Sequence, residues 1–170
     1  IWMDEQGPYS PALRDEVGRL ALQGRYDALI YFSYRYWTTA RTLKPSPTPS
    51  ILAPTAEDDG LYRLGLFRPL FAAATQFAFN SVEERDMLEA SMERPLPGEI
   101  VGVGSALPPM MDAAAFRERY RLEGPFVLYV GRIDLNKGCP ELFSHFLRYR
   151  KETGSDLKLV LIGRALLEWP

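Results

Sequence analysis

The part of the sequence that determines the fold class reads FVLYVGRIDLNKGCP, from Phe126 to Pro140. Its first five residues are apolar without polar alternation, which is typical of a strand buried on both faces of a parallel sheet. Gly131 ends this run and opens a short loop. Gly138 allows a tight turn, and Pro140 suits the first turn of a helix, where a missing N–H costs little. The stretch therefore predicts a strand, a loop and a helix N-terminus in succession.

The predicted loop carries two positive charges, Arg132 and Lys137. Open α/β sheets bind ligands where a strand leads through a loop into a helix, and the free N–H groups and dipole of the helix favour an anion. An arginine grips phosphate oxygens in a fork, whereas a lysine acts as a mobile point charge. We therefore interpret Gly131, Arg132, Lys137 and Gly138 as a diphosphate-binding loop. The alternative is an ordinary polar surface loop, since arginine and lysine are common in such loops. The pattern is neither a Walker loop nor G-x-G-x-x-G.

Composition narrows the class of protein. Of the 170 residues, 46% are apolar and 25% charged, so a packed core is expected and disorder is not. A net charge of −2 gives no reason to expect a nucleic-acid partner. The single cysteine fits a cytoplasmic location, and the single histidine argues against a histidine-based metal site or a Ser-His-Asp triad. No apolar run approaches the roughly 18 residues of a membrane span. Because the sequence begins without methionine and stops just after a predicted strand, we expect a piece of a longer protein.

Predicted strands alternate with predicted helices along the chain. The strands are expected at residues 26–32 (a second buried run), 50–54, 76–79, 99–103, 126–130 and 157–162, and the helices at 11–22, 33–41, 61–74, 113–121, after Ser81 and after Lys137. Ser81 and Glu84 match the capping box that starts a helix. Such alternation indicates an α/β fold with a doubly wound parallel sheet. Residues 104–109 look like a linker between two domains.

Taken together, these segments resemble a known family. The stretch from Phe126 to Gly138, followed by Leu142 and Phe146, closely resembles the donor loop of retaining glycosyltransferases of family 4, also called group 1. Residues 116–122 are similar to the segment that precedes that loop. Residues 54–59, 70–71 and 79–84 resemble the later part of the family's N-terminal domain. The resemblance covers about residues 26–163, and the Gly-Arg…Lys-Gly element is its most specific part.

The resemblance implies a GT-B fold, in which two Rossmann-like domains face each other. Residues 1–103 would be the second half of the N-terminal, acceptor-side domain, residues 104–112 the linker, and residues 113–170 the start of the donor domain. The implied reaction moves a hexose from a nucleoside-diphosphate sugar to an acceptor hydroxyl with retention, in polysaccharide or glycoconjugate biosynthesis. Arg132 and Lys137 would be the catalytic residues, because they would hold the diphosphate and stabilise the charge on the leaving group.

The same resemblance implies neither a metal nor another cofactor. The partners would be a nucleotide sugar and a glycan or glycolipid acceptor, and the cytoplasmic protein could contact the inner face of a membrane, although no polybasic cluster supports this. The family's pair of glutamates eight residues apart is absent, so this extent of chain is not expected to be catalytically competent alone.

One departure from the family affects the predicted acceptor side. Many members carry a histidine where this chain has Glu57, and a carboxylate cannot donate a hydrogen bond as a neutral imidazole does. Glu57 and Asp58 could contact the sugar or the acceptor, or belong to a solvated acidic loop. The departure motivates an alternative function, a non-catalytic sugar-nucleotide or glycan-binding module of the same fold. Two further alternatives concern packing: the aromatic residues 31–37 form a sugar platform or core, and Cys139 is a reactive thiol or a small core residue.

Overall fold

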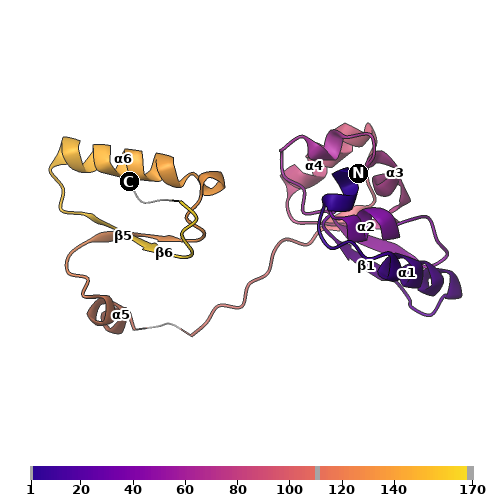
Figure 1. Ribbon diagram of the computed structural model, residues 1–170, viewed down its shortest axis with the longest axis horizontal. Helices are drawn as coiled ribbons and strands as arrows, with labels where there is room; N and C mark the ends of the chain where they lie inside the picture. Colours follow the sequence, from indigo (N-terminus) through magenta and orange to yellow (C-terminus); the bar gives the residue numbers. More distant parts are fainter. Residues whose placement is uncertain (1, 110–111, 168–170) are drawn as a thin grey trace. The chain divides into compact units, whose positions relative to one another are not determined.

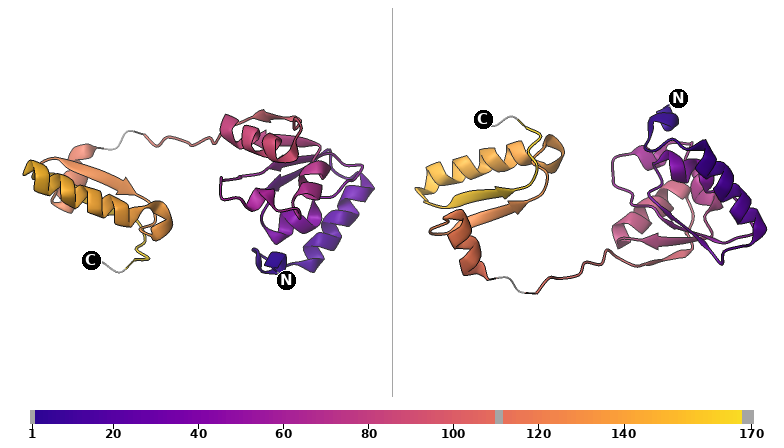
Figure 2. Two further views of the ribbon diagram at one scale, coloured as in Figure 1. Left: turned by 90° about the horizontal axis from the view of Figure 1, so that it is seen from above. Right: turned by 60° about the horizontal axis from the view of Figure 1, so that its bottom comes forward.

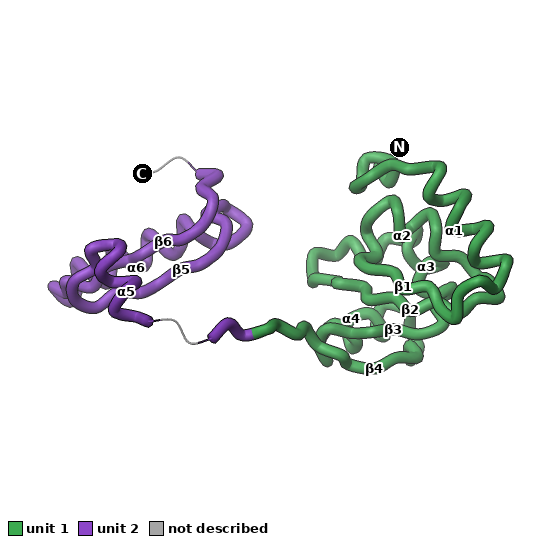
Figure 3. Tube along the Cα trace, turned by 90° about the horizontal axis from the view of Figure 1, so that it is seen from below, with its two compact units in different colours: residues 1–106 green, residues 107–170 purple. Residues whose placement is uncertain are grey.

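The computed structural model describes residues 2–109 and 112–167, which belong to two compact units, Ile1–Ala106 and Leu107–Pro170 (Figure 3). The boundary after Ala106 falls within the predicted linker at 104–112. Each unit has its own sheet, and every strand pairing is parallel. The predicted α/β class with parallel strands is therefore confirmed.

The first unit contains a four-stranded sheet in the order β1-β2-β3-β4 (Figure 3). Its strands are β1 (Leu29–Phe32), β2 (Ser50–Ala53), β3 (Gln76–Phe79) and β4 (Gly98–Ile100). Its helices are α1 (Pro11–Gln23), α2 (Trp37–Thr42), α3 (Arg68–Ala73) and α4 (Val82–Met92), with short 3-10 turns η1 (Trp2–Glu5) and η2 (Leu61–Arg63). Because consecutive strands are neighbours, right-handed crossovers place the connecting helices on one face of the sheet.

The two faces of this sheet differ in burial. Tyr31, Leu52 and Phe77 lie opposite one another in the register and face the aromatic core of the unit. On the other face, the side chains of Ile30 and Phe32 are 63% and 70% exposed. The prediction of a buried strand at residues 26–32 is therefore wrong for this face. The reason is that β1 lies at the edge of the sheet and the connecting helices cover only one side.

The helix predicted over residues 61–74 is interrupted. The chain forms η2, then turns and enters α3 only at Arg68. Pro69 lies in the first turn of α3, the position that tolerates a missing N–H, so the apolar pattern before it cannot continue as one helix. Phe67, Leu70 and Phe71 are nevertheless buried in the core. The apolar spacing thus identified part of the core correctly, but Leu64 and Leu66 of the same pattern are exposed and the helix is shorter than predicted.

The second unit contains β5 (Phe126–Val130) and β6 (Lys158–Ile162), paired in parallel. Its helices are α5 (Ala113–Tyr120) and α6 (Cys139–Thr153), with a 3-10 turn η3 (Leu135–Lys137) before α6. Helix α6 runs along one side of the two strands (Figures 1 and 2). As predicted, Asp112 caps α5, accepting a hydrogen bond of 2.8 Å from the Ala114 N–H.

Strand β5 is less buried than its sequence predicts. Val127, Leu128 and Val130 are 43%, 45% and 69% exposed, so the expectation of a strand buried on both faces is wrong. The cause is that β5 has a single neighbour, β6, in a two-stranded sheet. Among the described residues of this unit, only Ile133, Asp134 and Cys139 are buried, and all three belong to the loop after β5 or its junction with α6. Within residues 2–109 and 112–167, no helix has the length and apolar character needed to cross a membrane.

Candidate functional site

The predicted cationic loop lies between β5 and α6, with the order that the sequence indicated. Gly131 follows the last residue of β5, and η3 then carries the chain to Gly138. Gly138 has a φ of 67°, in the left-handed region that a side chain disfavours, which explains a glycine at this turn. Its carbonyl accepts from the Leu142 N–H at 3.0 Å, in the first turn of α6. The loop thus delivers Arg132 and Lys137 to the N-terminal end of a 15-residue helix.

Asp134 organises this loop. Its Oδ1 atom accepts a hydrogen bond of 2.9 Å from the Lys137 N–H, and its Oδ2 atom lies 3.3 Å from Nε of Arg132. The Asp134 side chain is 11% exposed and that of Arg132 is 59% exposed, so the ion pair is anchored at its carboxylate end. Because Asp134 engages Nε, the terminal nitrogens of the Arg132 guanidinium remain available for a bidentate contact with a phosphate. Sequence reasoning missed Asp134, although an aspartate three residues before the N–H that it accepts is a known capping pattern.

Two side chains contact the backbone carbonyl of Arg132. The Tyr129 hydroxyl donates to the Arg132 carbonyl at 2.7 Å, and Sγ of Cys139 lies 3.8 Å from the same oxygen. Hydrogen bonding with the Cys139 thiol is the main cause that raises the pKa of Tyr129 to about 12. Cys139 is fully buried, which agrees with the alternative of a small core residue.

A second loop, after β6, lies directly against the first. The Ile133 N–H donates to the Arg164 carbonyl at 3.0 Å, and the Leu166 N–H donates to the Ile133 carbonyl at 3.0 Å. A Cβ atom on Gly163 would lie 1.8 Å from the Gly131 carbonyl oxygen, so only glycine fits this approach. Sequence reasoning placed a strand end at Gly163 but gave no role to either Gly163 or Arg164.

The acidic residues Glu57 to Asp59 follow β2 in the first unit. Asp59 forms an ion pair with Arg35 and accepts a hydrogen bond of 3.0 Å from the Leu61 N–H. Asp58 accepts a longer hydrogen bond, 3.3 Å, from the Tyr62 hydroxyl. Glu57 is exposed, and no partner for its carboxylate is found among the described residues. Of the three, Glu57 is therefore the side chain left free for a ligand.

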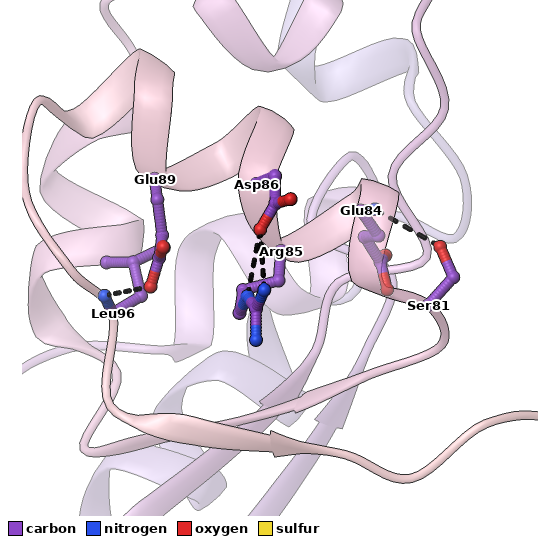
Figure 4. A network of polar contacts seen from close by, with 6 residues as sticks. All are labelled: Ser81, Glu84, Arg85, Asp86, Glu89 and Leu96. Atoms are coloured by element: carbon purple, nitrogen blue, oxygen red, sulfur yellow. Dashed lines mark hydrogen bonds and ion pairs between the residues drawn. The ribbon is translucent and has the colours of Figure 1, made fainter.

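Glu84 fixes this acidic loop in place. Its carboxylate is buried and accepts two hydrogen bonds of 2.6 Å, from the Ala56 N–H and the Asn80 N–H. Ser81 caps the helix as predicted, accepting from the Glu84 N–H at 3.2 Å (Figure 4). The carboxylate thus joins the loops after β2 and β3, a role that the capping pattern alone does not reveal. Thr55 beside it has a φ of 51°, an uncommon conformation for a β-branched residue.

The aromatic residues of segment 31–37 divide between core and surface: Tyr34 and Trp37 are buried, Tyr31 packs against the core, and Phe32 and Tyr36 are exposed. Tyr34 is fully buried and Trp37 is 2% exposed, so neither can serve as an open sugar platform. Burial is the main cause that raises the pKa of Tyr34 above its usual value. An open hollow of about 450 Å³ lies beside the acidic loop and is lined by Asp58, Tyr62 and Met87 among others.

Among the described residues, no three histidine, cysteine, aspartate or glutamate side chains are grouped so that they could hold a metal ion. The structure does bring together the guanidinium of Arg132 and the carboxylate of Asp134. The turn η3, which contains Lys137, begins directly after Asp134. This arrangement suits an anion. A scan against models of known protein families and a search of curated proteins each returned no match to the chain.

Proposed function

We propose that this chain is part of a retaining glycosyltransferase of family 4 with the GT-B fold. It would transfer a hexose from a nucleoside-diphosphate sugar to a glycan or glycolipid acceptor hydroxyl, in the cytoplasm or at the inner face of a membrane. The observation that carries the proposal is the loop after β5. There Asp134 holds Nε of Arg132 at 3.3 Å and leaves the outer edge of an exposed guanidinium open.

The chemistry of the proposed reaction matches what these residues supply. Cleavage of the bond between sugar and diphosphate leaves negative charge on the departing phosphate. Arg132 can stabilise that charge by donating two parallel N–H hydrogen bonds to it, and Lys137 adds a mobile positive charge. The positive end of the α6 dipole favours the same anion. Donors fixed before the charge develops lower the barrier more than donors that must reorganise.

Two features of the sheets support the proposed domain assignment. Parallel sheets are almost always covered on both faces, whereas Ile30 and Phe32 of β1 are exposed at the edge of theirs. We therefore propose that residues 1–103 are the second half of an acceptor-side domain whose first half pairs with β1. A two-stranded sheet is marginal alone, so residues 113–170 are proposed as the start of a donor domain.

The acidic loop is the proposed acceptor-side contribution. It follows β2, and ligands in open α/β sheets bind beyond the carboxyl ends of the strands. Glu57 and Asp58 would accept hydrogen bonds from sugar hydroxyls. A glutamate in the place of the family's histidine favours a second candidate function, a module that binds a nucleotide sugar or a glycan without transferring it.

The proposal is tested by calorimetric titration of the protein with UDP, GDP and their sugars. Replacement of Arg132 or Lys137 by alanine should weaken binding by about 1.5–3 kcal/mol, roughly 10- to 150-fold, the range for a lost charge-assisted contact. Lys151→Ala, on the exposed last turn of α6, is the matched control and should bind as the wild type does.

Two results would overturn the proposal: a folded wild type that binds none of these ligands, or binding that ignores both substitutions. Transfer of labelled sugar, measured on the same preparations, separates a transferase from the non-catalytic module.

A further inference from the structure

Arg132 follows β5 and Arg164 follows β6, on two loops that lie against each other. Strands β5 and β6 pair in register up to Val130 and Ile162, and the isolated bridge between Ile133 and Ala165 continues the same offset past the ends of both strands. By this offset, Arg132 and Arg164 occupy equivalent positions on the two adjacent loops. Neighbouring strands lie about 4.8 Å apart, so the two side chains start from adjacent stretches of backbone.

This placement is unfavourable without a ligand. Two positive charges held close together repel each other. One carboxylate, that of Asp134, lies 3.3 Å from Nε of Arg132. Arg164 is exposed, and within residues 112–167 its side chain has no hydrogen-bond or ion-pair partner. The backbones that carry the two arginines are held together by the hydrogen bonds between Ile133 and the loop after β6, and Gly163 approaches Gly131 closely.

Two guanidinium groups on adjacent loops fit an anion with two charged groups. A diphosphate has two adjacent phosphates and therefore offers oxygens to two forks at once. A monophosphate can be gripped by one fork alone, so a second arginine adds less to its binding.

We propose that Arg164 is a third cationic residue of the loop site and that, together with Arg132, it makes the site selective for nucleoside diphosphates over monophosphates. The inference rests on the proposed function, since it assigns a further residue to the same phosphate site. Arg132 grips one phosphate, Arg164 grips the other, and Lys137 supplies charge from η3.

The test measures diphosphate and monophosphate binding separately. Calorimetry with UDP and UMP, and with pyrophosphate and phosphate as probes without a base, is run on the wild type, Arg164→Gln and Arg164→Lys. Arg164→Gln should weaken UDP and pyrophosphate binding about 10- to 100-fold, as expected for one lost charge-assisted contact, and change UMP and phosphate binding much less. Arg164→Lys keeps the charge without the fork and should fall in between. Arg148→Gln removes the same charge from the exposed surface of α6 and serves as the control.

Thermal unfolding without ligand distinguishes a binding role from a structural one. Arg164→Gln removes a like-charge contact, so the melting temperature of the free protein should stay the same or rise, while the increase caused by UDP should shrink. A structural arginine would instead lower the melting temperature without ligand. That result, or equal losses for UDP and UMP, would overturn the inference.

The inference and the proposed function fail in different ways. If Arg132→Ala and Lys137→Ala weaken UDP binding but Arg164→Gln does not, the proposed function stands and the role of Arg164 is refuted. If the wild type binds no phosphate ligand, or if no substitution matters, both are refuted together.

Discussion

Replacing Glu84 by glutamine should destabilise the first unit selectively. The Glu84 side chain is buried and accepts hydrogen bonds of 2.6 Å from the N–H groups of Ala56 and Asn80. A glutamine has the same shape but only one acceptor oxygen, so its NH₂ group must face one of these two N–H donors. A buried donor left without a partner costs about 1–3 kcal/mol, and the remaining bond loses its charge assistance. We therefore expect Glu84→Gln to lower the free energy of unfolding by about 2 kcal/mol.

The neighbouring residue supplies a matched control. Glu83 is exposed and lies in the first turn of the same helix, where hydrogen bonding to its own backbone N–H is the main cause that lowers its pKa. Glu83→Gln removes the same charge but no buried contact, so it should change the free energy of unfolding far less than Glu84→Gln does.

Urea unfolding followed by the fluorescence of Trp37, which is buried in the core of the first unit, measures both variants. Hydrogen exchange provides a local test, because the amides of Ala56 and Asn80 should exchange faster in Glu84→Gln and remain protected in Glu83→Gln. Equal unfolding free energies for the two variants, within about 0.5 kcal/mol, would refute the account of Glu84 as the group that joins the two loops.

Three further predictions follow from packing, backbone approach and ionisation. Phe71→Ala removes a fully buried ring and should cost about 3–5 kcal/mol in urea unfolding, whereas Leu22→Ala, 72% exposed, should change it by less than about 0.5 kcal/mol. Gly163→Ala places a Cβ atom 1.8 Å from the Gly131 carbonyl oxygen and should abolish the binding of phosphate ligands. Gly104→Ala is the control, because a Cβ atom there has nothing within 4 Å, and it should bind as the wild type does. Retained binding in Gly163→Ala would contradict the close approach of the two loops. The pKa of Tyr129 is raised to about 12 from an ordinary 10.0, so between these pH values the hydroxyl is protonated in the folded state and ionised in the unfolded state. Stability should therefore be lost as the pH rises from about 10 towards 12, and this loss should be smaller in Tyr129→Phe; an ultraviolet difference titration in which Tyr129 ionises near pH 10 would contradict it.

Local features of the fold were predictable because they depend on neighbours in the sequence. The apolar run at 126–130, the caps at Ser81 and Asp112, and the glycine at 138 each act within a few residues, and the structure contains the corresponding elements. The degree of burial was not predictable in the same way. Whether Phe32 or Val130 is covered depends on which segments lie over the sheet, and an apolar run is the same in both cases.

The candidate site was predictable only in part for the same reason. Arg132 and Lys137 were identified because cations between a strand and a helix indicate anion binding. Asp134 was missed because its role depends on the path of the loop, which brings its carboxylate to 3.3 Å from Nε of Arg132. Arg164 was missed because it becomes a neighbour of Arg132 only through strand pairing, which joins residues far apart in the sequence.

The distribution of buried residues affects how ligand affinities should be interpreted. In the described part of the second unit, the three buried residues all belong to the loop or its junction with α6, and the strands beside it are largely exposed. Because such a unit buries little apolar surface outside the loop, we expect a fraction of molecules to hold it in an unfolded form. The measured dissociation constant then equals the intrinsic constant divided by the folded fraction. A substitution far from the phosphates that merely unfolds this unit would weaken binding to every ligand by the same factor, whereas loss of a phosphate contact would not.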